Sequence, residues 1–113
     1  MRFEFRDVLG NVVEVSSERV LHVIDRHPEM LGAAQHIESA LTDPDFVIVP
    51  TDNDDRRIYY RRHDFPYHSA CWLSVVVVAQ AREFVVTAYA TDYIKPGRTL
   101  WSKHQNRDST TTT

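Results

Sequence analysis

The sequence predicts an α+β domain, in which an N-terminal hairpin and two helices pack on one face of a curved four-stranded antiparallel sheet. Gly10-Asn11 separates two short strand-like runs, which is typical of a hairpin. Two stretches with helical spacing of apolar residues follow, and four strand-like runs come after them. The connections between these four runs are too short for a crossover, so we expect antiparallel pairing with the helices covering one face.

The first 27 residues are expected to hold the hairpin and the first helix. The hairpin strands span residues 2–6 and 11–15. A helix over residues 17–26 follows, because Ser16 or Ser17 can cap its first turn. Apolar side chains recur along one stripe of this helix, at Val20, Val23 and Ile24, with His27 at its end.

Pro28 marks the boundary between the two helical stretches. It disfavours helical geometry at the residue before it, and it can occupy the first position of the next helical stretch. That second stretch continues over residues 32–41 and ends at Asp43-Pro44. Its expected buried residues are Ala33, Ile37, Ala40 and Leu41.

The sheet strands are expected over residues 46–49, 57–62, 71–79 and 84–91. Four consecutive valines at 75–78 predict a central strand that is buried on both faces. Side chains alternate along a strand, so the last strand should have an apolar face and a polar face. The apolar set is Phe84, Val86, Ala88 and Ala90, and the polar set that should line the open face of the sheet is Thr87, Tyr89 and Thr91.

Length and composition favour one domain, residues 1–101, followed by a polar tail over 102–113 that we expect to be disordered. No window approaches the roughly 18 apolar residues of a membrane span, and the N-terminus does not resemble a signal peptide. Cys71 is the one cysteine, so neither an internal disulfide nor a multi-cysteine zinc site is expected. These features predict a cytoplasmic protein without metal, cofactor or membrane partner.

The formal net charge of -3 counts against a protein that coats nucleic acid by charge alone. It allows a local basic cleft, because the charges are segregated along the chain. An acidic run at residues 52–55 is followed directly by Arg56 and Arg57, with Arg61 and Arg62 close behind. The alternative is that most of these charges are simply solvated in a loop and hairpin.

The last strand and the residues after it form the first candidate site. Thr87, Tyr89 and Thr91 are hydroxyls on one face, and Lys95 and Trp101 lie beyond the strand. Hydroxyls and cations beside an aromatic residue suit a phosphate-bearing ligand. An ordinary amphipathic strand with a Thr- and Tyr-rich outer face is the alternative, since these residues favour strands.

The end of the first helix forms the second candidate site. His22 and Arg26 are neighbours on a helical face that points away from the apolar stripe. His27 lies nearer the core, at the helix end. A histidine near neutral pH can act as a general acid or base, and an arginine can bind phosphate. Capping of the helix C-terminus by Arg26 and His27 is the alternative.

Metal-free cleavage of RNA needs a base for the 2′-hydroxyl, an acid for the leaving oxygen and donors for the charged phosphorane. Aromatic rings can hold a base by stacking, and Tyr60, Tyr89 and Trp101 are candidates. Tyr60 shares its strand face with Arg62, and we place both on the open face.

The chain between about residues 18 and 101 resembles the phage-type nucleases of the barnase–EndoU–colicin–RelE superfamily. The residues that carry the resemblance are ERVLHVIDRHPEM, a short helix ending in TDPDFV, then RIYYRR, CWLSVVVVAQ and VVTAYATDYIKPGRTLW. The resemblance implies a metal-independent endoribonuclease, often a toxin, with an antitoxin or immunity protein as partner. It matches His22, Arg26 and His27 to helix-end positions, Thr87, Tyr89 and Thr91 to last-strand hydroxyls, and Lys95 and Trp101 to the terminal K-x-G…W.

The resulting hypothesis is an endoribonuclease that cleaves RNA by attack of the 2′-hydroxyl. His22 or His27 would be the acid or base, and Thr87 and Tyr89 would orient the substrate or stabilise the transition state. The residues that would bind phosphate are Arg26, Lys95 and Arg62. One alternative is a nucleic-acid- or protein-binding module without catalysis on the same fold. Another is an enzyme acting on a different phosphorylated substrate, although no glycine-rich phosphate loop is present.

Overall fold

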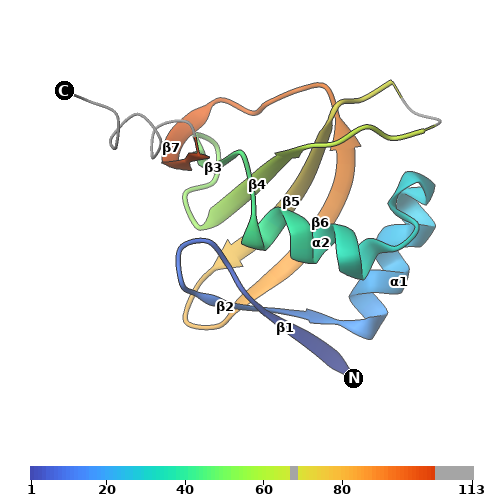
Figure 1. Cartoon of the computed structure of the whole chain (residues 1–113). Helices are drawn as coiled ribbons and strands as arrows, with labels where there is room; N and C mark the ends of the chain where they lie inside the picture. The colour runs from blue at the N-terminus through green and yellow to red at the C-terminus, as the bar shows by residue number, and fades with distance from the viewer. Residues whose placement is uncertain (67–68, 104–113) are drawn as a thin grey trace.

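The computed structural model describes residues 1–66 and 69–103, and it is built on a mixed β-sheet with two α-helices. Figure 1 shows α2 lying across the sheet, with α1 beside it. The strands are β1 (Arg2–Arg6), β2 (Val12–Ser16), β3 (Phe46–Pro50), β4 (Arg56–Arg62), β5 (Trp72–Ala79), β6 (Glu83–Thr91) and β7 (Gly97–Ser102). The helices are α1 (Ser17–Arg26), the short 3-10 helix η1 (Pro28–Met30) and α2 (Ala33–Thr42).

The predicted four-stranded antiparallel sheet is wrong, because the described part of the chain forms one seven-stranded mixed sheet in the order β1-β2-β6-β5-β4-β3-β7. The hairpin is part of this sheet, since β2 pairs in parallel with β6 through Val13–Glu83 and Glu14–Phe84. At the other edge β7 pairs antiparallel with β3. Both extra pairings join segments that lie far apart in the sequence.

The predicted local elements are otherwise confirmed. Ser16 caps α1, with its hydroxyl accepting a hydrogen bond from the amide of Arg19 at 3.0 Å. The α1 helix ends at Arg26 and α2 spans Ala33–Thr42, close to the expected limits. The valine-rich β5 is the central strand of the sheet, as expected for a strand that packs on both faces.

The main core lies between the helices and one face of the sheet. Val23 of α1, Met30 of η1 and four residues of α2 are fully or almost fully buried there. The α2 residues are the predicted Ala33, Ile37, Ala40 and Leu41. They pack against core residues of the sheet that include Val13, Val15, Val47, Tyr59, Leu73, Val75, Val77, Val85 and Ala88.

A β-bulge changes the faces of β6 relative to the predicted alternation. Val77 pairs with Val85 and Val76 pairs with Thr87, so Val86 is an extra residue between them. The side chains before the bulge are therefore shifted by one position. Val85 is buried in the main core, whereas Phe84, which was expected there, is 44% exposed.

The second face of the sheet is only partly open. A smaller apolar cluster, Ile48, Ile58 and Tyr60, lies on it, with Phe46, Trp72, Val76 and Ile94 packed around the cluster. Ile94 comes from the segment between β6 and β7, so residues 92–96 cover this part of the face. The polar side of β6 lies next to this covered region.

Gly97 allows β7 to approach β3 closely. A Cβ atom built at this position would lie 2.2 Å from the carbonyl oxygen of Val49 and 2.9 Å from the Cα of Pro50. Both are backbone atoms, so neither can rotate away. Any larger residue at this position would have to push the two strands apart.

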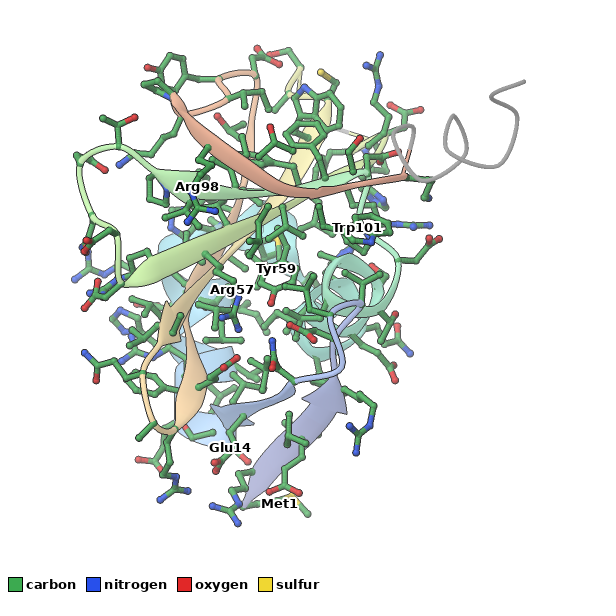
Figure 2. The ribbon with its side chains drawn as sticks, turned by 90° about the vertical axis from the view of Figure 1, so that its left-hand side faces the viewer. Met1, Glu14, Arg57, Tyr59, Arg98 and Trp101 are labelled. Atoms are coloured by element: carbon green, nitrogen blue, oxygen red, sulfur yellow. The ribbon has the colours of Figure 1, made fainter. Side chains whose placement is uncertain are left out.

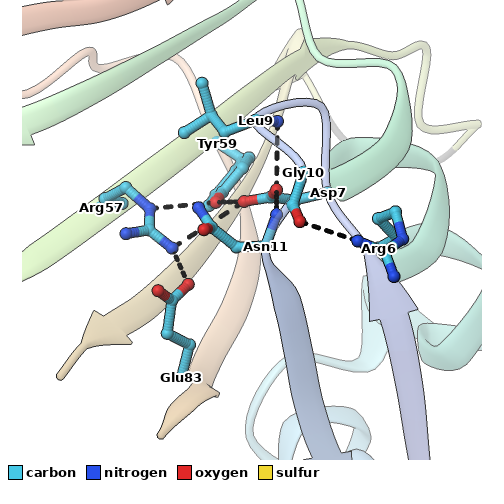
Figure 3. A network of polar contacts seen from close by, with 8 residues as sticks. All are labelled: Arg6, Asp7, Leu9, Gly10, Asn11, Arg57, Tyr59 and Glu83. Carbon is cyan, nitrogen blue, oxygen red and sulfur yellow. Dashed lines mark hydrogen bonds and ion pairs between the residues drawn. The ribbon is translucent and has the colours of Figure 1, made fainter. Parts of the chain in front are cut away.

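A buried polar network joins the hairpin turn to the centre of the sheet (Figure 3). The Tyr59 hydroxyl donates to the carboxylate of Asp7 and accepts from Nε of Arg57 at 3.0 Å. Arg57 also donates to Glu83 on β6, and Asp7 accepts from the amides of Leu9 and Asn11 in the turn. Figure 2 shows Arg57 and Tyr59 side by side near the middle of the molecule.

The network explains why charged groups are tolerated in this core. Each carboxylate or guanidinium has hydrogen-bonding partners, which offsets the cost of removing it from water. Burial, and then the hydrogen bond to the Asp7 carboxylate, raises the pKa of Tyr59 well above its ordinary value. The phenol therefore stays protonated, and its proton lies in the hydrogen bond to Asp7.

The predicted tail over 102–113 falls largely outside the described residues, which end at Lys103. Ser102 is the last residue of β7, and the ammonium of Lys103 lies 2.9 Å from the carboxylate of Asp43. Within residues 1–66 and 69–103, neither α-helix is long and apolar enough to cross a bilayer.

Candidate functional site

The imidazole of His27 lies against the ring of Tyr89, where the end of α1 meets β6. The ring centroids are 5.7 Å apart and the ring planes are inclined by 36°. His27 is the C-terminal cap residue of α1, and its backbone amide donates to the carbonyl of Val23 at 2.8 Å. The turn into η1 then holds the imidazole, half-buried, beside the strand.

Glu29 lies next to His27. Its Oε2 atom accepts a hydrogen bond from the backbone amide of Ala90 at 3.1 Å and lies 3.9 Å from Nδ1 of His27. The Ala90 amide is available because β2 pairs with β6 only at residues 83 and 84. The carboxylate is thus fixed by the strand, close enough to attract an imidazolium at His27.

A polar cavity of about 220 Å³ opens beside Tyr89 on the second face of the sheet. Two cations, Arg56 and Lys95, take part in its lining, together with the carboxylate side chain Asp52. The full set of lining residues is Pro50, Asp52, Asn53, Arg56, Ile58, Val76, Tyr89 and Lys95. Tyr89 therefore lies between the imidazole on one side and the cationic cavity on the other.

Lys95 is held in this cavity by the backbone around it. Its amide donates to the Tyr60 hydroxyl at 3.1 Å, and the next residue, Pro96, accepts from the amide of Thr51 at 3.0 Å. Its ammonium lies 3.0 Å from Asp52, and this hydrogen bond raises the pKa of Lys95. Lys95 is therefore a cation at physiological pH.

The predicted hydroxyls lie along the same face as Tyr89. Thr87 pairs with Val76, and Val76 lines the cavity. Thr91 ends the strand, where its hydroxyl accepts a hydrogen bond from the amide of Tyr93 at 2.9 Å. Thr87 is thus beside the candidate site, while Thr91 shapes the turn that leads to Lys95.

His22 and Arg26 are exposed on α1, as predicted. Within the part of the chain that the structure describes, neither side chain has a hydrogen bond, an ion pair or a ring contact. His27, rather than His22, is the histidine that the fold brings to Tyr89.

Three predicted substrate-binding residues lie elsewhere or have other contacts. Tyr60 is on the expected face but fully buried beneath residues 92–96, so it positions Lys95 instead of offering a stacking surface. Arg62 is exposed, with its guanidinium carbon 5.4 Å from the ring centroid of Trp72. Trp101 packs against the main core, on the face opposite Tyr89.

Sequence reasoning missed Glu29 and Arg56 as site residues. Glu29 reads as a first-turn charge of a short helix, and nothing in the sequence shows that its carboxylate would reach Ala90. Arg56 belongs to a charged run that is expected to be solvated. The short sequence distance between Asp52, in the loop after β3, and Arg56, at the start of β4, was the available signal.

Within the described residues, no three His, Cys, Asp or Glu side chains gather as ligands for a metal ion. No protein-family model, curated protein or solved structure matches this chain.

Proposed function

We propose that this chain is a metal-independent endoribonuclease that cleaves RNA by attack of the 2′-hydroxyl. The observation that carries the proposal is the position of Tyr89, with His27 and Glu29 on one side and a cavity lined by Lys95 and Arg56 on the other. A base, a carboxylate that stabilises its protonated form, and cations for a phosphate are the parts that such a reaction needs.

His27 acts as the general base in this mechanism. It takes the proton of the 2′-hydroxyl, and the 2′-oxygen then forms a bond to phosphorus. The bond from phosphorus to the 5′-oxygen breaks, and that oxygen takes a proton from solvent, leaving a 2′,3′-cyclic phosphate and a 5′-hydroxyl. The imidazolium of His27 then returns its proton to solvent. Glu29 favours the imidazolium that forms, because it lies 3.9 Å from Nδ1 of His27.

Lys95 and Arg56 stabilise the phosphorane. Both are positively charged residues of the same cavity, and each already lies beside a carboxylate, Lys95 beside Asp52 and Arg56 beside Asp55. A bound phosphate takes the place of these exposed carboxylates as the partner of the cations. The hydroxyls of Tyr89 and Thr87 donate hydrogen bonds to the phosphorane. Arg26 and His22 contact the RNA backbone next to it.

The resemblance to the barnase–EndoU–colicin–RelE superfamily supports the same proposal. It adds that the chain acts as a toxin in the cytoplasm and is neutralised by an antitoxin or immunity protein. Such a partner would cover the face that carries Tyr89 and Lys95. Co-expression with the product of a neighbouring gene tests this part, since a neutralising partner must protect RNA from cleavage.

The direct test is incubation of the purified protein with labelled RNA and DNA of the same sequence, in the presence of EDTA. The proposal predicts cleavage of the RNA alone. Intact RNA would overturn it and favour the second candidate, a binding module without catalysis on the same fold. The ion pair between Asp52 and Lys95 favours that candidate, since a paired ammonium stabilises the added charge of a phosphorane less than a free one does. Filter binding of the same RNA would then identify it.

A further inference from the structure

A larger cavity, of about 750 Å³, lies between η1 and the segment that follows β4. Its volume falls within the range of small-ligand sites. Phe65 is almost fully buried at 3% exposure, whereas Leu31 is 76% exposed. The lining residues are Pro28, Glu29, Leu31, His36, His63, Asp64, Phe65 and Pro66.

The aromatic side chains of this cavity form one cluster. The rings of His36 and His63 meet edge to face with centroids 5.0 Å apart, and His63 lies 4.5 Å from Phe65. Burial, and then the neighbouring His63, lowers the pKa of His36, so His36 is neutral at physiological pH. The cluster therefore offers flat ring surface to a ligand.

The carboxylates of the cavity are acceptors. Glu29 and Asp64 are carboxylates, and neither lysine nor arginine is among the described lining residues. A phosphate would be repelled here, whereas a flat neutral ring that carries amino groups would find both stacking surface and hydrogen-bond acceptors.

Glu29 connects this cavity to the candidate site. The same carboxylate that lines the cavity lies 3.9 Å from Nδ1 of His27 and accepts from the amide of Ala90. In a ring bound in this cavity, one face or edge would contact Glu29, which separates the cavity from His27. The phosphate groups of the same ligand would bind Lys95 and Arg56 on the other side of Tyr89.

We propose that this cavity binds the base of a nucleotide next to the cleaved phosphate and selects bases that carry an amino group. Guanine, adenine and cytosine can donate amino hydrogens to Asp64, since Glu29 already accepts from the amide of Ala90. Uracil offers a single N–H between two carbonyl oxygens, and the carboxylates repel those oxygens. The position beside a cleaved phosphate rests on the proposed function, whereas the base selectivity does not.

Titration of the full chain with nucleosides tests the selectivity, because nucleosides lack the phosphate that Lys95 would attract. Amide chemical shifts are followed by NMR with guanosine, adenosine, cytidine and uridine. The inference predicts shifts at residues 29–36 and 63–65, and binding of cytidine at least about tenfold tighter than that of uridine. Equal affinities for cytidine and uridine, or shifts confined to other residues, would overturn it.

Asp64→Asn provides the matched variant, because the exposed side chain can be replaced without loss of core packing. The amide gains a donor that suits the uracil oxygens, so the preference for cytidine should fall about fivefold. Glu38→Gln, an exposed carboxylate outside the cavity, should leave the preference unchanged. An unchanged preference in Asp64→Asn would contradict the inference.

The same titration separates this inference from the proposed function. Selective nucleoside binding by a protein that leaves RNA intact would support the base site and remove the nuclease. RNA cleavage by a protein that shows no nucleoside selectivity would support the nuclease and remove the base site. Leu21→Ala, at an exposed position outside the cavity, should bind the nucleosides as the wild type does.

Discussion

The imidazole of His27 packs against the phenol ring of Tyr89 with 5.7 Å between the ring centroids, although 62 positions separate the two residues in the chain. The contact joins the end of α1 to the edge of β6 that β2 leaves unpaired. The same edge binds the carboxylate of Glu29 through the amide of Ala90. An unpaired stretch of strand thus fixes the position of the proposed general base, His27.

Replacement of His27 by alanine is expected to reduce RNA cleavage at least about 100-fold, because the general base is lost. The imidazole is only half-buried, so the fold should persist. Leu21→Ala, at a 67% exposed position of the same helix, is the control and should cleave at the wild-type rate. A His27→Ala rate close to that of the wild type, or a larger loss in His22→Ala, would contradict this assignment.

Changes at Lys95 and Asp52 should move RNA affinity in opposite directions. Lys95→Met removes a phosphate contact and should lower the slope of log K against log salt by about 0.7. Asp52→Asn removes the carboxylate 3.0 Å from the ammonium and should strengthen binding. Binding isotherms at several salt concentrations measure both effects. Equal slopes for the wild type and Lys95→Met would show that Lys95 does not bind phosphate.

Tyr59→Phe should destabilise the protein by about 1–3 kcal/mol, because it leaves the buried Asp7 and Arg57 without the hydroxyl between them. Urea unfolding measures the loss. Tyr93→Phe, at a position that is 64% exposed, removes a hydroxyl from the surface and should change stability little. Similar free energies of unfolding for the two variants would argue against a stabilising role of the network.

Stability should also fall at alkaline pH through Tyr59. Burial, and then Asp7, raises the pKa of this phenol in the folded protein, whereas the unfolded chain loses the proton near pH 10. Its contribution is therefore complete below about pH 10 and declines as the pH rises above that value, by at most about 1.4 kcal/mol per pH unit. Urea unfolding on both sides of about pH 10 should show a steeper decline in the wild type than in Tyr59→Phe. Parallel declines would contradict the raised pKa.

Gly97→Ala should weaken the edge of the sheet that holds Lys95. The added Cβ would meet the backbone of Val49 at 2.2 Å, so β7 must move away from β3. We expect a loss of about 1–3 kcal/mol and faster hydrogen exchange in β7, together with weaker RNA binding. Thr99→Ala, an exposed position of the same strand, is the control. Unchanged exchange in β7 would show that the close approach is not needed.

The local elements could be predicted from the sequence because their signals are local. The cap at Ser16, the proline after His27 and the valines of β5 each act over a few residues. The sheet order could not be predicted, because the β2–β6 pairing consists of two residue pairs between distant segments. The strand β7 lacked a strong alternation, so its pairing with β3 gave no sequence signal.

Part of the candidate site could also be predicted, because some of its residues have local sequence signals. His27, Tyr89 and Lys95 lie in recognisable local contexts, and the fold brings His27 against Tyr89, which lines the same cavity as Lys95. Trp101 was expected to stack on a base, but the register of β7 directs it to the main core. Tyr60 lies on the predicted face of the sheet, but residues 92–96 fold over it and bury it. This burial depends on tertiary contacts that the local sequence does not indicate.

Mass spectrometry of the RNA ends made by the wild type and by His27→Ala, in EDTA, tests the central claim most directly. The proposed attack of the 2′-hydroxyl predicts 2′,3′-cyclic phosphate and 5′-hydroxyl ends from the wild type, and intact RNA from the variant. Ends with a 3′-hydroxyl and a 5′-phosphate, or the same cyclic ends in equal yield from His27→Ala, would contradict it.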